Sequence, residues 1–180
     1  MAFEYRRHLL GLTTGAVIDK GMIINNSETI TFGDSVQLDG NGHVIVGTAG
    51  EEVLGVVIGI IDANGNNITS PAADVDGTVS GTGLTLTYVS AADNETDKKV
   101  RAQVMVDKNA EFYNDSSGTL AQTNLLQFFD LASESQIDAS SASDTNGQFQ
   151  LIEIDPDGDG DASKGLFKIA ESQLDPYTQG

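Results

Sequence analysis

The sequence predicts an all-β fold, built as one or two small β-barrel or sandwich lobes with long loops and little helix. Hydrophobic residues make up only 39% of the 180 residues and aromatic residues 6%, while 20 glycines accompany many Ser, Thr, Asn and Asp residues. This composition favours short strands joined by many turns over long amphipathic helices. Short runs that alternate polar and apolar residues recur along the chain and support the same fold class.

The first half of the chain is a succession of strand and turn signals. We expect strands at residues 16–18, 22–24, 29–32, 35–38, 43–46 and 51–61. Residues 39–42 (DGNG) predict a hairpin turn, because Asp-Gly and Asn-Gly pairs adopt positive φ at low cost. Residues 19–21 (DKG) predict a second turn between two short strands.

The domain organisation follows from one long turn-rich segment. Residues 62–83 contain hardly any large apolar side chains and are expected to be a loop that divides two lobes. The expected order is an N-terminal arm (1–14), an N-terminal β-lobe (15–62), a linker (63–83) and a C-terminal β-lobe (84–180).

Two segments of the C-terminal lobe receive different predictions. Residues 148–154 and 166–170 are expected to form a hairpin. Residues 124–131 (NLLQFFDL) fit a short helix and a buried strand equally well.

The charge of the chain is strongly negative and unevenly distributed. With 27 acidic and 9 basic residues the net charge is −18, which disfavours a nucleic-acid partner because phosphate backbones would be repelled. The few basic residues are clustered, so Arg6, Arg7, Lys99 and Arg101 are the candidates for contact with a protein partner. In an alternating strand Lys99 and Arg101 share one face, and an edge strand protected by basic residues is the alternative interpretation.

The acidic segment DPDGDGD is the sharpest local motif. Asp155, Asp157, Asp159 and Asp161 stand at alternate positions, as carboxylates do in the first half of a calcium-binding loop. The glutamate that completes an EF-hand is replaced by Leu166, and the flanking segments read as strands. The motif therefore predicts a calcium-binding hairpin loop or a solvated acidic turn, and no other cofactor is expected.

Signals for catalysis and for membrane insertion are weak. The chain has no cysteine, which excludes disulfides and thiol chemistry, and its only histidines are His8 and His43. No nucleophile elbow or phosphate-binding loop is present, so we expect no enzymatic activity. The longest apolar run, residues 53–61, is much shorter than the roughly 20 residues of a membrane helix, so no membrane partner is expected.

Several segments resemble the capsid decoration (cement, or head-stabilising) proteins of tailed bacteriophages. In the first half these are residues 33–40 (GDSVQLDG) and 54–59 (LGVVIG), a Gly-Asp strand entry, a Gly-rich hairpin and a Gly-Val strand. In the second half, residues 104–107 lead into Phe112, and residues 129–131 are followed by 149–152 and the Asp155-Pro156 turn. The resemblance covers about residues 15–170 and brings no active-site signature with it.

The resemblance implies a structural role on the outer capsid surface of a virion. Its implied partners are the major capsid protein and further copies of the chain, often arranged as a homotrimer that bridges coat subunits. Two alternatives remain open: a carbohydrate- or receptor-binding β-module of a tail fibre or adhesin, and a tail or neck component.

Overall fold

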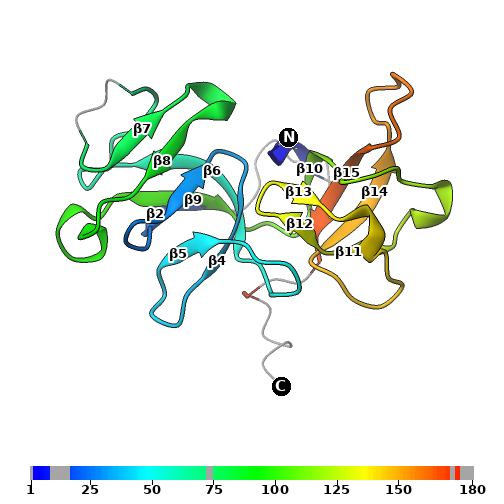
Figure 1. Cartoon of the computed structure of the whole chain (residues 1–180), viewed down its shortest axis with the longest axis horizontal. Coiled ribbons are helices and arrows are strands. Elements are labelled where there is room, and N and C mark those ends of the chain that lie inside the picture. Colours follow the sequence, from blue (N-terminus) through cyan, green and yellow to red (C-terminus); the bar gives the residue numbers. More distant parts are fainter. Residues whose placement is uncertain (1, 9–16, 72–74, 171–172, 175–180) are drawn as a thin grey trace.

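The protein folds into two β-lobes that lie side by side (Figure 1). The computed structural model describes residues 2–8, 17–71, 75–170 and 173–174. It is nearly all β, with several antiparallel sheets and no closed barrel among the described residues, which confirms the predicted all-β, sandwich-like class.

The N-terminal lobe contains a five-stranded and a three-stranded antiparallel sheet. The first sheet has the strand order β2 (Val17–Ile23), β9 (Arg101–Met105), β6 (Gly55–Ile61), β4 (Ser35–Leu38) and β5 (Val44–Val46). The second has the order β3 (Thr29–Thr31), β8 (Thr87–Val89) and β7 (Thr78–Ser80). The two sheets enclose a mainly aliphatic core, in which Tyr88 is the one aromatic residue that is fully buried.

The C-terminal lobe contains a second five-stranded sheet and a short hairpin. The sheet has the order β1 (Glu4–His8), β10 (Ala110–Asp115), β15 (Lys164–Ile169), β14 (Phe149–Ile154) and β11 (Phe128–Phe129). The hairpin consists of β12 (Leu131–Ser133) and β13 (Gln136–Ile137). The core of this lobe is aromatic: Phe3 stacks on Phe149 with ring centroids 4.6 Å apart and meets Phe112 edge-on.

Helical structure is confined to four short turns in the described chain. They are η1 (Gly83–Thr85), η2 (Asn94–Lys98), η3 (Gln122–Asn124) and η4 (Ala139–Ser141). The ambiguous segment 124–131 thus forms neither one helix nor one strand: the end of η3 is followed by an exposed Leu126 at positive φ, then by β11.

The predicted lobe boundaries differ from the structure in three places. Residues 4–8 form β1, paired with β10 of the C-terminal sheet, instead of an unattached arm. Strand β7 lies within the expected linker. Strands β8 and β9, expected in the C-terminal lobe, belong to the sheets of the N-terminal lobe, so the chain crosses between lobes after Met105. The rest of the expected arm, residues 1 and 9–14, lies outside the described residues.

The turn predicted at residues 19–21 is instead an irregularity within the continuous strand β2. The register against β9 shifts between Ile18 and Met22, as at a β-bulge. Gly21 has φ +66°, and a Cβ there would meet the Cβ of Arg101 at 2.8 Å, so glycine lets the irregular strand remain against β9. The predicted hairpins at 39–42 and at 148–170 are confirmed by the pairing of β4 with β5 and of β14 with β15.

The junction between the lobes is held by the fully buried side chain of Gln148. Its Oε1 accepts hydrogen bonds from Leu131 N at 2.9 Å and Gly50 N at 3.3 Å. Its Nε2 donates to the carbonyl oxygens of Thr48 and Glu51. One amide therefore joins the loop before β6 in the N-terminal lobe to the start of β12 in the C-terminal lobe.

Further contacts cross the same junction. Phe3 N donates to Gly33 O at 2.8 Å, and Ser35 N donates to Glu134 O at 2.7 Å. Met105 of the N-terminal sheet is buried in the aromatic core of the other lobe, together with Val53 and Val56. The two lobes are consequently one body with shared core residues.

Replacing Gln148 by alanine should destabilise the whole protein. The substitution leaves the buried Leu131 N–H and two loop carbonyls without their partner, which typically costs about 2–4 kcal/mol of unfolding free energy. Chemical denaturation monitored by fluorescence and circular dichroism measures this loss. Gln150→Ala is the matched control, because the side chain of Gln150 donates one surface hydrogen bond, to Leu126 O, and its loss should cost under about 1 kcal/mol. Equal losses in the two variants would contradict the role of Gln148.

Candidate interaction surfaces

The four basic residues predicted to contact a partner lie on different lobes. Arg6 and Arg7 lie on β1, in the sheet of the C-terminal lobe. Arg101 begins β9 in the N-terminal lobe, and Lys99 precedes it in a left-handed conformation at the end of η2. The structure therefore forms no single basic patch from these residues.

The predicted alternation of burial around Lys99 and Arg101 is confirmed, but β9 begins at Arg101, so Lys99 lies before the strand and not on its face. Val100, Ala102 and Val104 are buried, whereas Lys99 is exposed and Arg101 is partly exposed. The alternative interpretation as a protected edge strand is wrong, because β9 pairs with β2 on one side and with β6 on the other.

Arg6 is fixed on the surface of the C-terminal lobe by aromatic and acidic neighbours. Its guanidinium carbon lies 4.6 Å from the ring centroid of Tyr113, within the range of a cation–π contact. Its Nη2 lies 3.5 Å from a carboxylate oxygen of Glu4 and 3.9 Å from one of Asp157. Arg6 thus connects β1 with the acidic loop. The side chain of Arg7 lies outside what the structure describes.

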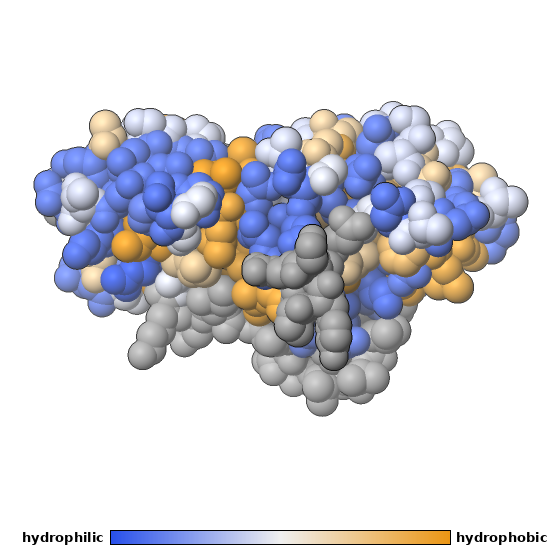
Figure 2. All heavy atoms as spheres, turned by 90° about the horizontal axis from the view of Figure 1, so that it is seen from below, coloured by the Kyte–Doolittle hydropathy of each residue, from blue (hydrophilic) through white to orange (hydrophobic). Residues whose placement is uncertain are grey.

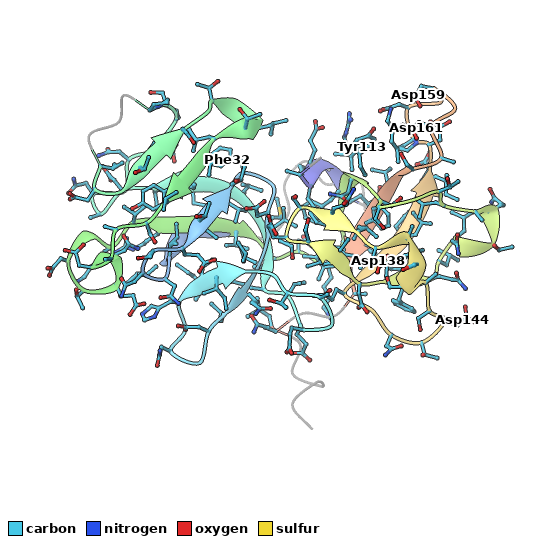
Figure 3. The ribbon with its side chains drawn as sticks, in the orientation of Figure 1. Phe32, Tyr113, Asp138, Asp144, Asp159 and Asp161 are labelled. Atoms are coloured by element: carbon cyan, nitrogen blue, oxygen red, sulfur yellow. The ribbon has the colours of Figure 1, made fainter. Side chains whose placement is uncertain are left out.

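The four aspartates of the acidic motif lie in the β14–β15 hairpin loop, as predicted, with Asp159 and Asp161 far from the lobe junction (Figure 3). The carboxylate of Asp155 accepts from the backbone N–H groups of Asp159 and Gly160, at 3.0 and 2.9 Å. Asp159 accepts from Asp161 N, and Asp161 accepts from Ser163 N and Oγ. These carboxylates stabilise the turn itself.

The ammonium group of Lys164 lies between two of these carboxylates. Its Nζ donates to Asp159 Oδ2 and lies 3.6 Å from Asp161 Oδ2. The hydrogen bond from Lys164 lowers the pKa of Asp159, and the bond from the Ser163 hydroxyl lowers that of Asp161. The described residues hold no group of three or more His, Cys, Asp or Glu side chains arranged for a metal ion. Calcium binding here stays a prediction, and it would require Lys164 to leave Asp159.

A groove lies at the junction of the lobes. Its volume is about 320 Å³, and its lining is mostly apolar. The lining residues are Phe3, Glu4, Tyr5, Phe32, Gly33, Val57, Ile58, Leu84 and Met105. They come from β1 and β9 and from segments of the N-terminal lobe far apart in sequence, so no local pattern could have predicted the groove.

A buried carboxyl group lies next to this groove. Asp34 follows Gly33, is 4% exposed and accepts a hydrogen bond from Thr31 N at 2.7 Å. The pKa of Asp34 is raised to about 7, mainly by burial; the hydrogen bond from Thr31 N opposes this rise, and the charge of Glu134 in the other lobe contributes to it. The stability of the junction should therefore depend on pH near neutrality.

The coloured residues on the face seen in Figure 2 are mostly hydrophilic. On the face seen in Figure 2, hydrophobic residues gather along the line where the two lobes meet, between hydrophilic surfaces on either side. No helix in the described parts of the chain is long and apolar enough to cross a membrane. Comparisons with protein families, with characterised proteins and with solved structures found no match.

Replacing Lys164 by glutamine should raise the pKa of Asp159 towards its usual range, because the hydrogen bond that lowers it most is weakened. The pKa of Asp161 should change less, since Ser163 supplies its main hydrogen bonds. Carboxyl-carbon NMR titration measures both values. Lys168→Gln on the same strand is the control and should change neither. An unchanged Asp159 pKa in Lys164→Gln would show that Lys164 does not hold this carboxylate in solution.

Replacing Asp34 by asparagine should remove a pH dependence of stability. Because the folded pKa is about 7 against 3.8 for the exposed group, the folded state binds the extra proton between these values. The unfolding free energy should thus fall as pH rises from about 4 to 7, by on the order of 3 kcal/mol. Asp34→Asn keeps the acceptor for Thr31 N and should be the more stable protein at pH 8. Chemical denaturation at several pH values measures the unfolding free energy of both proteins. Parallel plots of this free energy against pH would contradict the role of Asp34.

Proposed function

We propose that this chain is a non-enzymatic structural protein of a tailed-bacteriophage particle, which binds the outer surface of the capsid and stabilises the shell by bridging coat subunits. Its partners in this proposal are the major capsid protein and further copies of the chain in a homotrimer. The motifs at residues 33–40 and 54–59, which resemble decoration proteins, are the starting point of the proposal.

The observation that carries the proposal is the rigid connection of the two lobes. Gln148 and the core residues shared at the junction keep surfaces on the two lobes at a fixed separation. A rigid body that touches neighbouring subunits through several modest contacts binds far more tightly than any one contact would allow. Bridging is the task for which such a body is suited.

The charge distribution supports a role facing solvent. A net charge of −18 is unfavourable beside packaged nucleic acid and keeps a protein soluble at high local concentration. Basic residues lie on both lobes, Arg101 on one and Arg6 on the other, and Arg6 would exchange its contacts with Glu4 and Asp157 for acidic residues of a coat subunit.

The proposal is tested by quantitative mass spectrometry of purified particles from the source. We expect the chain at one copy per coat subunit or at a simple fraction of that number. A handful of copies per particle would favour a tail, neck or fibre component, and absence from particles would refute the viral role.

Charge reversal tests the contact residues. Shells prepared without the protein are incubated with the double variant Arg6→Glu, Arg101→Glu. Its occupancy should be about tenfold or more below that of the wild type, since like charges across an interface are repulsive. The double variant Lys108→Glu, Lys168→Glu carries the same change of net charge and is the control. Equal occupancy of the two variants would mean that Arg6 and Arg101 do not contact the shell.

A further inference from the structure

The apolar groove runs along an edge strand. Strand β1 is the last strand of its sheet, and β10 is the strand that it pairs with among those described. The groove is lined on this side by Glu4 and Tyr5 of β1 and on the other by residues of the N-terminal lobe, including Ile58 and Leu84. A sheet edge beside an apolar channel is the arrangement that binds an added strand.

Ile58 is exposed because of a bulge in β6. The strand reads Gly55–Ile61 (GVVIGII), and every residue of it except Ile58 is buried. The register against β9 shifts between Val57 and Gly59, as at a β-bulge, and Ile58 is left 38% exposed. Bulges of this kind redirect a side chain, and here the redirected side chain lines the groove.

Leu84 is the second exposed apolar residue of the groove. It lies in the η1 turn and is 62% exposed. The bottom of the groove is formed by residues that are almost fully buried, among them Phe3, Val57 and Met105. The groove therefore combines a rigid base with two large apolar side chains that solvent still reaches.

The main chain directly before β1 already bonds the N-terminal lobe. Phe3 N donates to Gly33 O of the N-terminal lobe, away from β10. Backbone groups two residues apart in a strand point to the same side, so the N–H and C=O of Tyr5 point to the side of Gly33. Gly33 permits this approach, because a Cβ at its φ of +83° would meet Phe3 O at 2.5 Å.

We propose that the groove binds an extended segment of a partner protein, added as a strand beside β1 through the main chain of Tyr5. Apolar side chains at alternate positions of the segment pack on Ile58 and Leu84. A Lys or Arg of the segment lies near Glu4.

The charge of the groove favours a segment of a different protein over a second copy of this chain. Glu4 is the one charged residue among the nine that line it in the described chain, and the cation beside it, Arg6, is shared with Asp157. A second copy of the chain would bring a further charge of −18. A basic, apolar segment of a different protein is attracted instead. This inference goes beyond the proposed function, since it specifies a partner segment without reference to a shell.

A selection from displayed random peptides of about eight residues tests the inference on the isolated chain. Peptides are selected on the wild-type protein and counter-selected on Ile58→Ser, Leu84→Ser. We expect enriched peptides to alternate apolar residues with other residues and to contain Lys or Arg. In solution they should bind the double variant about tenfold or more weakly than the wild type, and binding should slow hydrogen exchange at the Tyr5 amide.

Leu126→Ser is the matched control, because Leu126 is 64% exposed, close to the value for Leu84, and lies outside the groove. It should leave peptide binding unchanged. Three outcomes would overturn the inference: no peptide that depends on Ile58 and Leu84, enrichment of acidic peptides, or binding without protection of Tyr5. None of these outcomes bears on whether the chain is found in particles. The peptide-binding groove and the capsid role can therefore be refuted independently of each other.

Discussion

The amide of Gln148 is the interaction on which the arrangement of the lobes depends. An amide offers two donors and two acceptor positions; at Gln148 the oxygen accepts from both lobes, and the nitrogen donates twice to the N-terminal lobe. Because the side chain is fully buried, water cannot replace a lost bond. A carboxylate could not donate to the two loop carbonyls, and an apolar residue could bond neither lobe. Gln148 is therefore the one buried side chain that bonds both lobes with its own amide among the described contacts, and it helps to set the shape of the groove between them.

The two ends of the described chain reinforce this junction. Phe3, near the N-terminus, places its ring in the aromatic core of the C-terminal lobe while its N–H bonds Gly33 of the other lobe. Near the C-terminus, Gln173 N donates to Val53 O, and its side-chain oxygen accepts from Leu38 N at 2.7 Å. Both terminal segments adjoin strands of the C-terminal lobe and form hydrogen bonds with the N-terminal lobe. Lobes connected in this way cannot separate without losing core contacts, so they are expected to unfold together.

The sequence predicted the parts of the fold that depend on neighbouring residues. Alternation located β3 and β4, and the Asp-Gly and Asn-Gly pairs located the hairpin between β4 and β5, because these signals act within a few residues. Strand β1 was missed since its partner β10 is about one hundred residues away and its charged residues resembled a free terminus. Ile58 could not be distinguished within an unbroken apolar run, because its exposure depends on the register of β6 against β9. The groove was missed for the same reason.

The exposure of Ile58 and Leu84 is informative because large apolar residues are scarce in this chain. Aromatic residues make up 6% of the sequence, and there is no tryptophan, so the two cores use most of the large side chains available. Leaving an isoleucine of a central strand in solvent forgoes on the order of 1 kcal/mol of burial, and the bulge also interrupts the ladder with β9. A regular strand would have avoided both costs. The combination of a bulge, an exposed β-branched residue and an adjacent sheet edge is therefore better explained by a binding surface than by the stability of the fold alone.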